Sequence, residues 1–139
     1  MFRSFSRMLA TAAIGSLLIL PAVGAIDEAE FANLMKQAGK LNGATKKAID
    51  AGDGATITAN AAEYSRIAKP VADFYKAKHV ADAVEFANTM DSSAQKLAAA
   101  GKAGNMADAG AAFQAVTGTC AGCHNAHRIK NADGTYGFK

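Results

Sequence analysis

Two cysteines and a histidine lie within five consecutive residues near the C-terminal end of the chain, Cys120-Ala-Gly-Cys123-His124. They are the only cysteines in the sequence. On a helix, positions three and four apart share a face, so Cys120, Cys123 and His124 would project to one side. Two thiols at this spacing can add to the two vinyl groups of a haem while the imidazole binds the iron. The C-x-x-C-H pattern therefore predicts one covalently bound haem c, attached at Cys120 and Cys123, with His124 as the proximal iron ligand.

Residues 1–25 have the layout of a secretory signal peptide. Arg3 and Arg7 precede an apolar run that ends at Leu20, and small residues follow it. The run is short for a membrane span, so we expect cleavage at the end of this segment, with an uncleaved anchor as the alternative. Residues 26–139 would then be an exported, periplasmic domain with no stable membrane span. Export favours the haem interpretation, because two unoccupied thiols would risk oxidation outside the cytoplasm.

The charge of the cleaved chain is nearly balanced. Loss of Arg3 and Arg7 lowers the number of basic residues from 15 to 13, against 12 acidic residues, for a formal charge of +1. The sequence has no cluster of basic residues and no glycine-rich phosphate loop, so nucleic-acid binding is not expected. Removal of 25 of the 139 residues leaves 114, a length that suits one small domain.

Apolar residues recur with the helical period in four consecutive segments, and no strand pattern is evident. Four such helices joined by short turns predict an all-α fold, an antiparallel up-and-down four-helix bundle. The core-facing positions are rich in alanine, which buries little apolar area, so a haem between the helices near the C-terminal end of the bundle would fill the remaining space. The expected helical segments are 27–51, 57–74, 80–97 and a last one that starts near residue 105.

Local signals predict the helix boundaries. Gly52-Asp53-Gly54 is expected to end the first helix, and Gly101 the third. Asn105 is a good N-cap for the fourth helix. Pro70 lies within the second helix, where we expect it to kink the helix or remove one backbone hydrogen bond.

The chain resembles the cytochrome c′ family and its six-coordinate relatives in its signal peptide, its helix layout and a single C-x-x-C-H near the C-terminus followed by Arg128. His127 stands where the family usually has Tyr or Phe. The family's first helix places a residue over the distal face of the haem, with a glycine four positions later, and Met35 and Gly39 match this pair. The family's Arg four residues before the distal position, which often meets a haem propionate, is Phe31 here. The resemblance implies a bundle with the haem near its C-terminal end.

The distal residue decides which function to expect. A Met thioether closes the sixth coordination site and suits electron transfer, whereas an apolar residue leaves the iron five-coordinate and open to small gases. Met35 therefore favours a monohaem electron carrier with redox proteins as partners, and no catalytic base or nucleophile points to an enzyme. A five-coordinate protein that binds NO or CO is the main alternative, in which Met35 would only fill a gap in the core. The resemblance also leaves open a homodimer through the first two helices.

The residues after the motif allow two interpretations each. His127 either hydrogen-bonds a haem propionate or replaces the aromatic packing of the family. Arg128 either lies along the proximal side of the haem, where it would tune the iron electrostatically, or is exposed at the end of the helix. The tail beyond Asp133-Gly134 suggests a turn after which Tyr136 and Phe138 fold back against a surface that the sequence does not specify.

A haem-free metal-binding module is a further alternative. Cys120, Cys123 and His127, with His124 or His79, offer enough ligand atoms for zinc. Structural zinc sites usually draw ligands from two separated segments, however, and here nearly all lie on one expected helix. His79 lies near a helix junction among lysines, where a surface role is expected.

Overall fold

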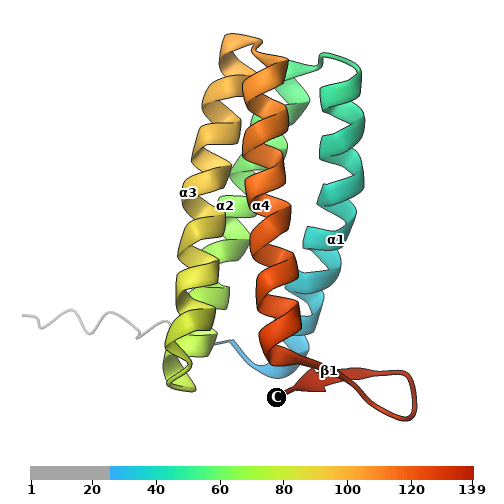
Figure 1. Ribbon diagram of the computed structural model, residues 1–139, viewed down its shortest axis with the longest axis vertical. Helices are drawn as coiled ribbons and strands as arrows, with labels where there is room; N and C mark the ends of the chain where they lie inside the picture. The colour runs from blue at the N-terminus through green and yellow to red at the C-terminus, as the bar shows by residue number, and fades with distance from the viewer. Residues whose placement is uncertain (1–25) are drawn as a thin grey trace, which may run out of the picture.

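The computed structural model describes residues 26–139, and four helices make up most of this part of the chain (Figure 1). The helices run alternately up and down, so the start of the first and the end of the last lie at the same end of the bundle. This arrangement confirms the predicted all-α four-helix bundle. The elements are α1 (Glu28–Asp50), α2 (Gly54–Ala77), α3 (Ala81–Ala103), α4 (Met106–His127), β1 (Arg128–Lys130) and β2 (Tyr136–Phe138).

The predicted signal peptide, residues 1–25, lies outside the described residues. Within residues 26–139, no helix is both long enough and apolar enough to cross a membrane.

Side-chain caps start three of the four helices. The Asp27 carboxylate accepts a hydrogen bond from the Glu30 N–H at 2.8 Å, and Asp53 begins α2 in the same way. The Asn105 side chain accepts one from the Asp108 N–H at 3.1 Å, so the predicted N-cap is confirmed. These contacts satisfy backbone donors that have no partner within a helix.

Helix α2 contains Pro70 and ends at Ala77, three residues after the expected segment. One predicted boundary is wrong, because α3 does not stop at Gly101. Gly101 is buried instead, and a Cβ there would lie 2.9 Å from the Gly54 carbonyl oxygen of α2, so this glycine allows two helices to approach closely. The helix ends at Gly104, whose φ of 66° belongs to the left-handed conformation that glycine adopts readily.

Helix α1 is held less extensively than the other three. Helices α2 and α3 pack most extensively, followed by α3 and α4, whereas α1 packs less extensively against α2 and least against α4. The core is built largely from alanine and a few larger side chains. The largest fully buried ones are Tyr64, Ile57, Ile67, Leu97, Val116 and Thr45.

A short hairpin follows α4, which the sequence pattern did not predict. Strand β1 pairs with β2 in antiparallel register, with Arg128 opposite Phe138 and Lys130 opposite Tyr136. Three-residue strands are too short to show the alternating pattern on which strand prediction depends. The turn between them has Gly134 at a φ of 83°, which agrees with the predicted turn at Asp133-Gly134.

Candidate haem-binding site

Cys120, Cys123 and His124 lie in the last two turns of α4, and all three are half-buried. The helix is continuous through the motif, so the three side chains project from neighbouring positions of one face. Both cysteines are free thiols. Burial raises the pKa of both, and the adjacent Tyr75 hydroxyl only partly offsets this rise for Cys123. A raised pKa is the opposite of what redox-active and metal-binding cysteines show, because those react as thiolates.

The imidazole of His124 has the electrostatic surroundings of a neutral metal ligand. Burial lowers its pKa, and the positive charge of Arg128 lowers it further. The neutral form, which is the one that binds a metal ion, is therefore favoured.

The two edges of α4 beside its buried face differ in packing, since the edge with Gly122 lies tightly against α3 and the opposite edge is only half-buried. At Gly122, within the motif, a Cβ would lie 2.6 Å from Cε1 of the Phe86 ring, so α3 packs closely against this edge. On the opposite edge, half-buried residues recur at intervals of three or four positions. Its members are Phe113, Thr117, Cys120 and His124.

Helix α1 also has two different edges, one that is hydrogen-bonded to α2 and one that is half-buried. On the first of these edges, which we call the held edge, the Gln37 Oε1 accepts a hydrogen bond from the Arg66 Nη2 of α2 at 2.7 Å. On the other edge, half-buried residues recur every seven positions. They are Met35, Asn42 and Ile49. The held edge of α1 faces α2 and the packed edge of α4 faces α3, so we infer that the two half-buried edges lie on the sides where α1 and α4 are neighbours (Figure 1), and we call this region the α1–α4 seam.

Cys120 and Met35 lie at the same height along the seam. Met35 is seven residues after the first residue of α1, and Cys120 is seven residues before the last residue of α4. With a rise of about 1.5 Å per residue, each lies about 10 Å from the same end of the bundle. The seam thus has the Cys120 thiol, the neutral His124 imidazole and the Met35 thioether within about one helical turn, with the Cys123 thiol on the adjacent face of α4, and this set of groups suits a flat, largely apolar haem between two helices.

The polar interior next to the seam is formed by Tyr64, which is fully buried. Its hydroxyl donates a hydrogen bond to the Asn42 Oδ1 at 2.7 Å, and burial raises its pKa to about 12. The Thr45 hydroxyl beside it is buried without a hydrogen-bond partner. Tyr64 therefore remains a neutral donor near the middle of the seam.

Residues 78–128 match the family model described as Cytochrome C′. The resemblance to the cytochrome c′ family is confirmed. The matched segment holds α3, α4, the whole C-x-x-C-H motif and Arg128, while α1, all of α2 and the rest of the hairpin lie outside it. Cytochromes c′ carry one covalently attached haem c, in agreement with the predicted cofactor. Comparison with curated proteins gave no match, and comparison with solved structures gave none.

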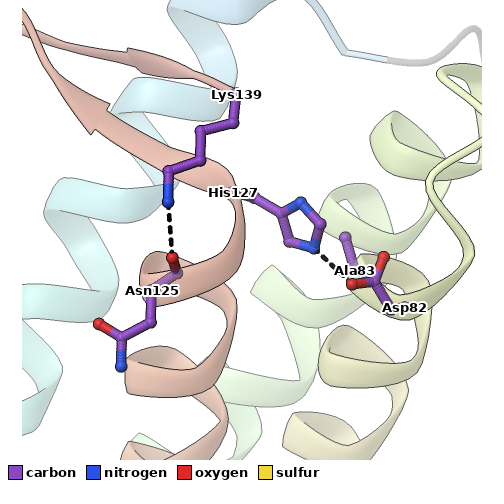
Figure 2. A network of polar contacts seen from close by, with 5 residues as sticks. All are labelled: Asp82, Ala83, Asn125, His127 and Lys139. Atoms are coloured by element: carbon purple, nitrogen blue, oxygen red, sulfur yellow. Dashed lines mark hydrogen bonds and ion pairs between the residues drawn. The ribbon is translucent and has the colours of Figure 1, made fainter.

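The two residues that follow the motif, His127 and Arg128, have different neighbours. Figure 2 shows the His127 Nε2 at 2.9 Å from the Asp82 Oδ2 of α3, and the His127 ring lies 5.8 Å from that of Tyr75. The His127 ring therefore packs against the Tyr75 ring, as in the second of the two interpretations, in which His127 replaces the aromatic residue of the family. Arg128 is exposed, and its guanidinium lies 4.2 Å from the centre of the Tyr136 ring.

The zinc alternative finds no support in the geometry. His79 is exposed in the turn between α2 and α3, at a φ of 59°. In the described part of the chain, no three His, Cys, Asp or Glu side chains are grouped as a metal ion would require.

Sequence reasoning missed three neighbours of the motif, Tyr75, Asp82 and Phe86. Tyr75 follows Phe74 at the end of an apolar pattern, and its position eleven residues after Tyr64 could have placed it on the buried face of α2. Asp82 lies 45 positions from His127, so no local signal links the two.

Proposed function

We propose that the chain is an exported, periplasmic monohaem c-type cytochrome that carries electrons between redox proteins and is not an enzyme. Cys120 and Cys123 hold the haem through thioethers, and His124 binds the iron on the proximal side. The observation that supports this assignment most strongly is the C-terminal part of α4, where two thiols with raised pKa values and an imidazole in its neutral form project from neighbouring positions of one helix. The haem supplies one-electron chemistry at its iron, and the protein supplies ligands and an apolar surrounding.

Met35 is the proposed distal ligand. It lies at the height of Cys120 on the facing edge of α1, and it is half-buried instead of filling the core. Gly39, one turn later, supports the same assignment. Gly39 is exposed, and a Cβ there would meet no atom of residues 26–139 within 4 Å, so its support rests on its spacing from Met35, which matches the resembling family.

The alternative is a five-coordinate protein that binds NO or CO. One observation favours it, namely that α1 and α4 pack least extensively of the adjacent helix pairs. A distal ligand on such a helix could leave the iron and admit a gas. Absorption spectra of the ferric protein, together with addition of carbon monoxide to the reduced protein, separate the two functions. A near-infrared band of His/Met haem and slow carbon monoxide binding support the carrier, whereas a high-spin spectrum and rapid binding support the gas-binding protein.

Covalent attachment is tested separately. If both thioethers form, haem stays with the polypeptide in denaturing electrophoresis, and the double variant Cys120→Ala/Cys123→Ala releases it into acid-acetone. The variant Thr117→Ala, on the same edge of α4 but without a thiol, is the matched control and should retain its haem. Complete release of haem from the wild-type holoprotein would contradict the proposed attachment.

A further inference from the structure

The C-terminal hairpin, apart from its first residue Arg128, lies outside the segment that matches the family. An isolated two-stranded hairpin is at best marginally stable, so contacts with the bundle must hold this one in place. Most of its residues are exposed, including Tyr136 at 57% and Ile129 at 39%. Phe138 is the exception, because its side chain is half-buried against the core.

Phe138 joins an aromatic cluster that α1 and α2 supply. Its ring centre lies 5.1 Å from that of Phe31 in an edge-to-face arrangement, 5.4 Å from that of Phe74 and 6.3 Å from that of Tyr75. Phe31 and Phe74 stack in turn at 4.5 Å. Aromatic pairs at these distances stabilise a contact beyond the area that they bury. The side chain of Phe138 is therefore attached to the first turn of α1.

The backbone at the same point is attached to α4. The Lys139 N–H donates a hydrogen bond to the His127 carbonyl oxygen at 2.9 Å. The Lys139 ammonium donates a second one to the Asn125 carbonyl oxygen at 2.8 Å, as Figure 2 shows. The end of the chain thus links the last turn of α4 to the first turn of α1, across the end of the α1–α4 seam.

This link lies one helical turn from the proposed distal ligand. Phe31 and Met35 are four residues apart on α1, so they project from the same face. Of the neighbouring helix pairs, α1 and α4 pack least extensively. The link that the hairpin adds between these two helices therefore makes a larger relative contribution to the position of Met35, and Phe138 makes the aromatic part of that link.

We propose that Phe138 is a positioning residue for the distal haem ligand, because it fastens the first turns of α1 to α4 and so holds the Met35 thioether over the haem site. This inference rests on the proposed function, since it requires Met35 to bind the iron. Loss of the Phe138 ring lets the start of α1 move away from α4, and the sixth coordination site opens.

The test compares the holoprotein with its Phe138→Ala variant. We expect the variant to lose most of the near-infrared His/Met band and to bind carbon monoxide faster in the reduced state. In the same variant, amide hydrogen exchange in the first three turns of α1 should accelerate about tenfold, the equivalent of about 1.4 kcal/mol. Phe138→Leu keeps part of the apolar contact and should restore part of the band. Tyr136→Ala is the matched control on the same hairpin, and it should behave as the wild type in all three measurements.

Two results would overturn the inference while the proposed function stands. One is a Phe138→Ala variant with a wild-type band and wild-type carbon monoxide binding, whatever its exchange rates, because Phe138 would then only stabilise the hairpin. The other is a Tyr136→Ala variant that loses the band equally. Absence of the band from the wild type itself would show that the proposed coordination fails, and the role of Phe138 would fail with it.

Discussion

Replacement of Gly101 by Ala tests the close approach of α2 and α3. A Cβ at this position would lie 2.8 Å from the Thr58 Oγ1, 2.9 Å from the Gly54 carbonyl oxygen and 2.9 Å from the Ile57 Cγ2. The backbone oxygen cannot rotate away, so the two helices must separate locally. Overpacking of this kind costs about 1–3 kcal/mol.

The matched control is Gly118→Ala on α4. A Cβ at Gly118 would meet no atom of the described residues within 4 Å. The only expected change in stability is therefore a gain of about 1 kcal/mol from the higher helix propensity of Ala. Both variants gain that propensity, and the difference between them therefore isolates the cost of the contact. We expect Gly101→Ala to unfold at a temperature lower than that of Gly118→Ala by about 5–15 °C.

Thermal unfolding of both holoproteins, followed by circular dichroism, measures this difference. Gly101 lies near the end of the bundle opposite to the C-x-x-C-H motif, so the haem absorption spectrum should stay that of the wild type. Equal unfolding temperatures for the two variants would refute the reasoning, because the contact between the helices would then tolerate a methyl group.

Three further predictions concern the site. Met35→Leu should remove the near-infrared band, lower the reduction potential and let the reduced protein bind carbon monoxide, and an unchanged spectrum would reassign Met35 to the core. Tyr64→Phe should lower the free energy of unfolding by about 1 kcal/mol in chemical denaturation, since the Asn42 amide loses its donor; a stabilised variant would contradict this. The apoprotein should lose stability as the pH falls through the ordinary pKa of histidine, about 6.5, because the lowered pKa of His124 means that the unfolded chain binds the proton first. His124→Gln should remove this component of the pH dependence, and an apoprotein with the same slope in the variant would refute the assignment.

Local chemistry explains why much of the fold could be predicted. The cap at Asn105 and the C-x-x-C-H motif depend on residues within one helical turn, and the structure has both on the expected helix. Gly101 was misassigned because a glycine that ends a helix and a glycine that admits a neighbouring helix look alike in sequence. Only the approach of Gly54, 47 positions away, distinguishes them.

The missing parts of the site depend on contacts between distant residues. The contact between His127 and Asp82 joins α4 to α3, and no pattern along the sequence predicts this contact. The partners of Phe138 lie on α1 and α2, so the sequence could indicate that the tail folds back but not where it docks. That Met35 and Cys120 lie at the same height in the bundle follows only from the observed ends of α1 and α4.

The uneven packing of the four helices also bears on how the protein matures. The three helices that pack most extensively are consecutive along the chain, so α2, α3 and α4 can assemble through contacts between sequence neighbours, which form early in folding. Helix α1 leaves the ribosome first, yet we expect it to dock last. Until it docks, the edge of α4 that carries Cys120 and His124 is open to solvent, and a haem can enter there. Closure of the bundle would then follow haem attachment, so that a chain without haem keeps a loose first helix that proteases can recognise.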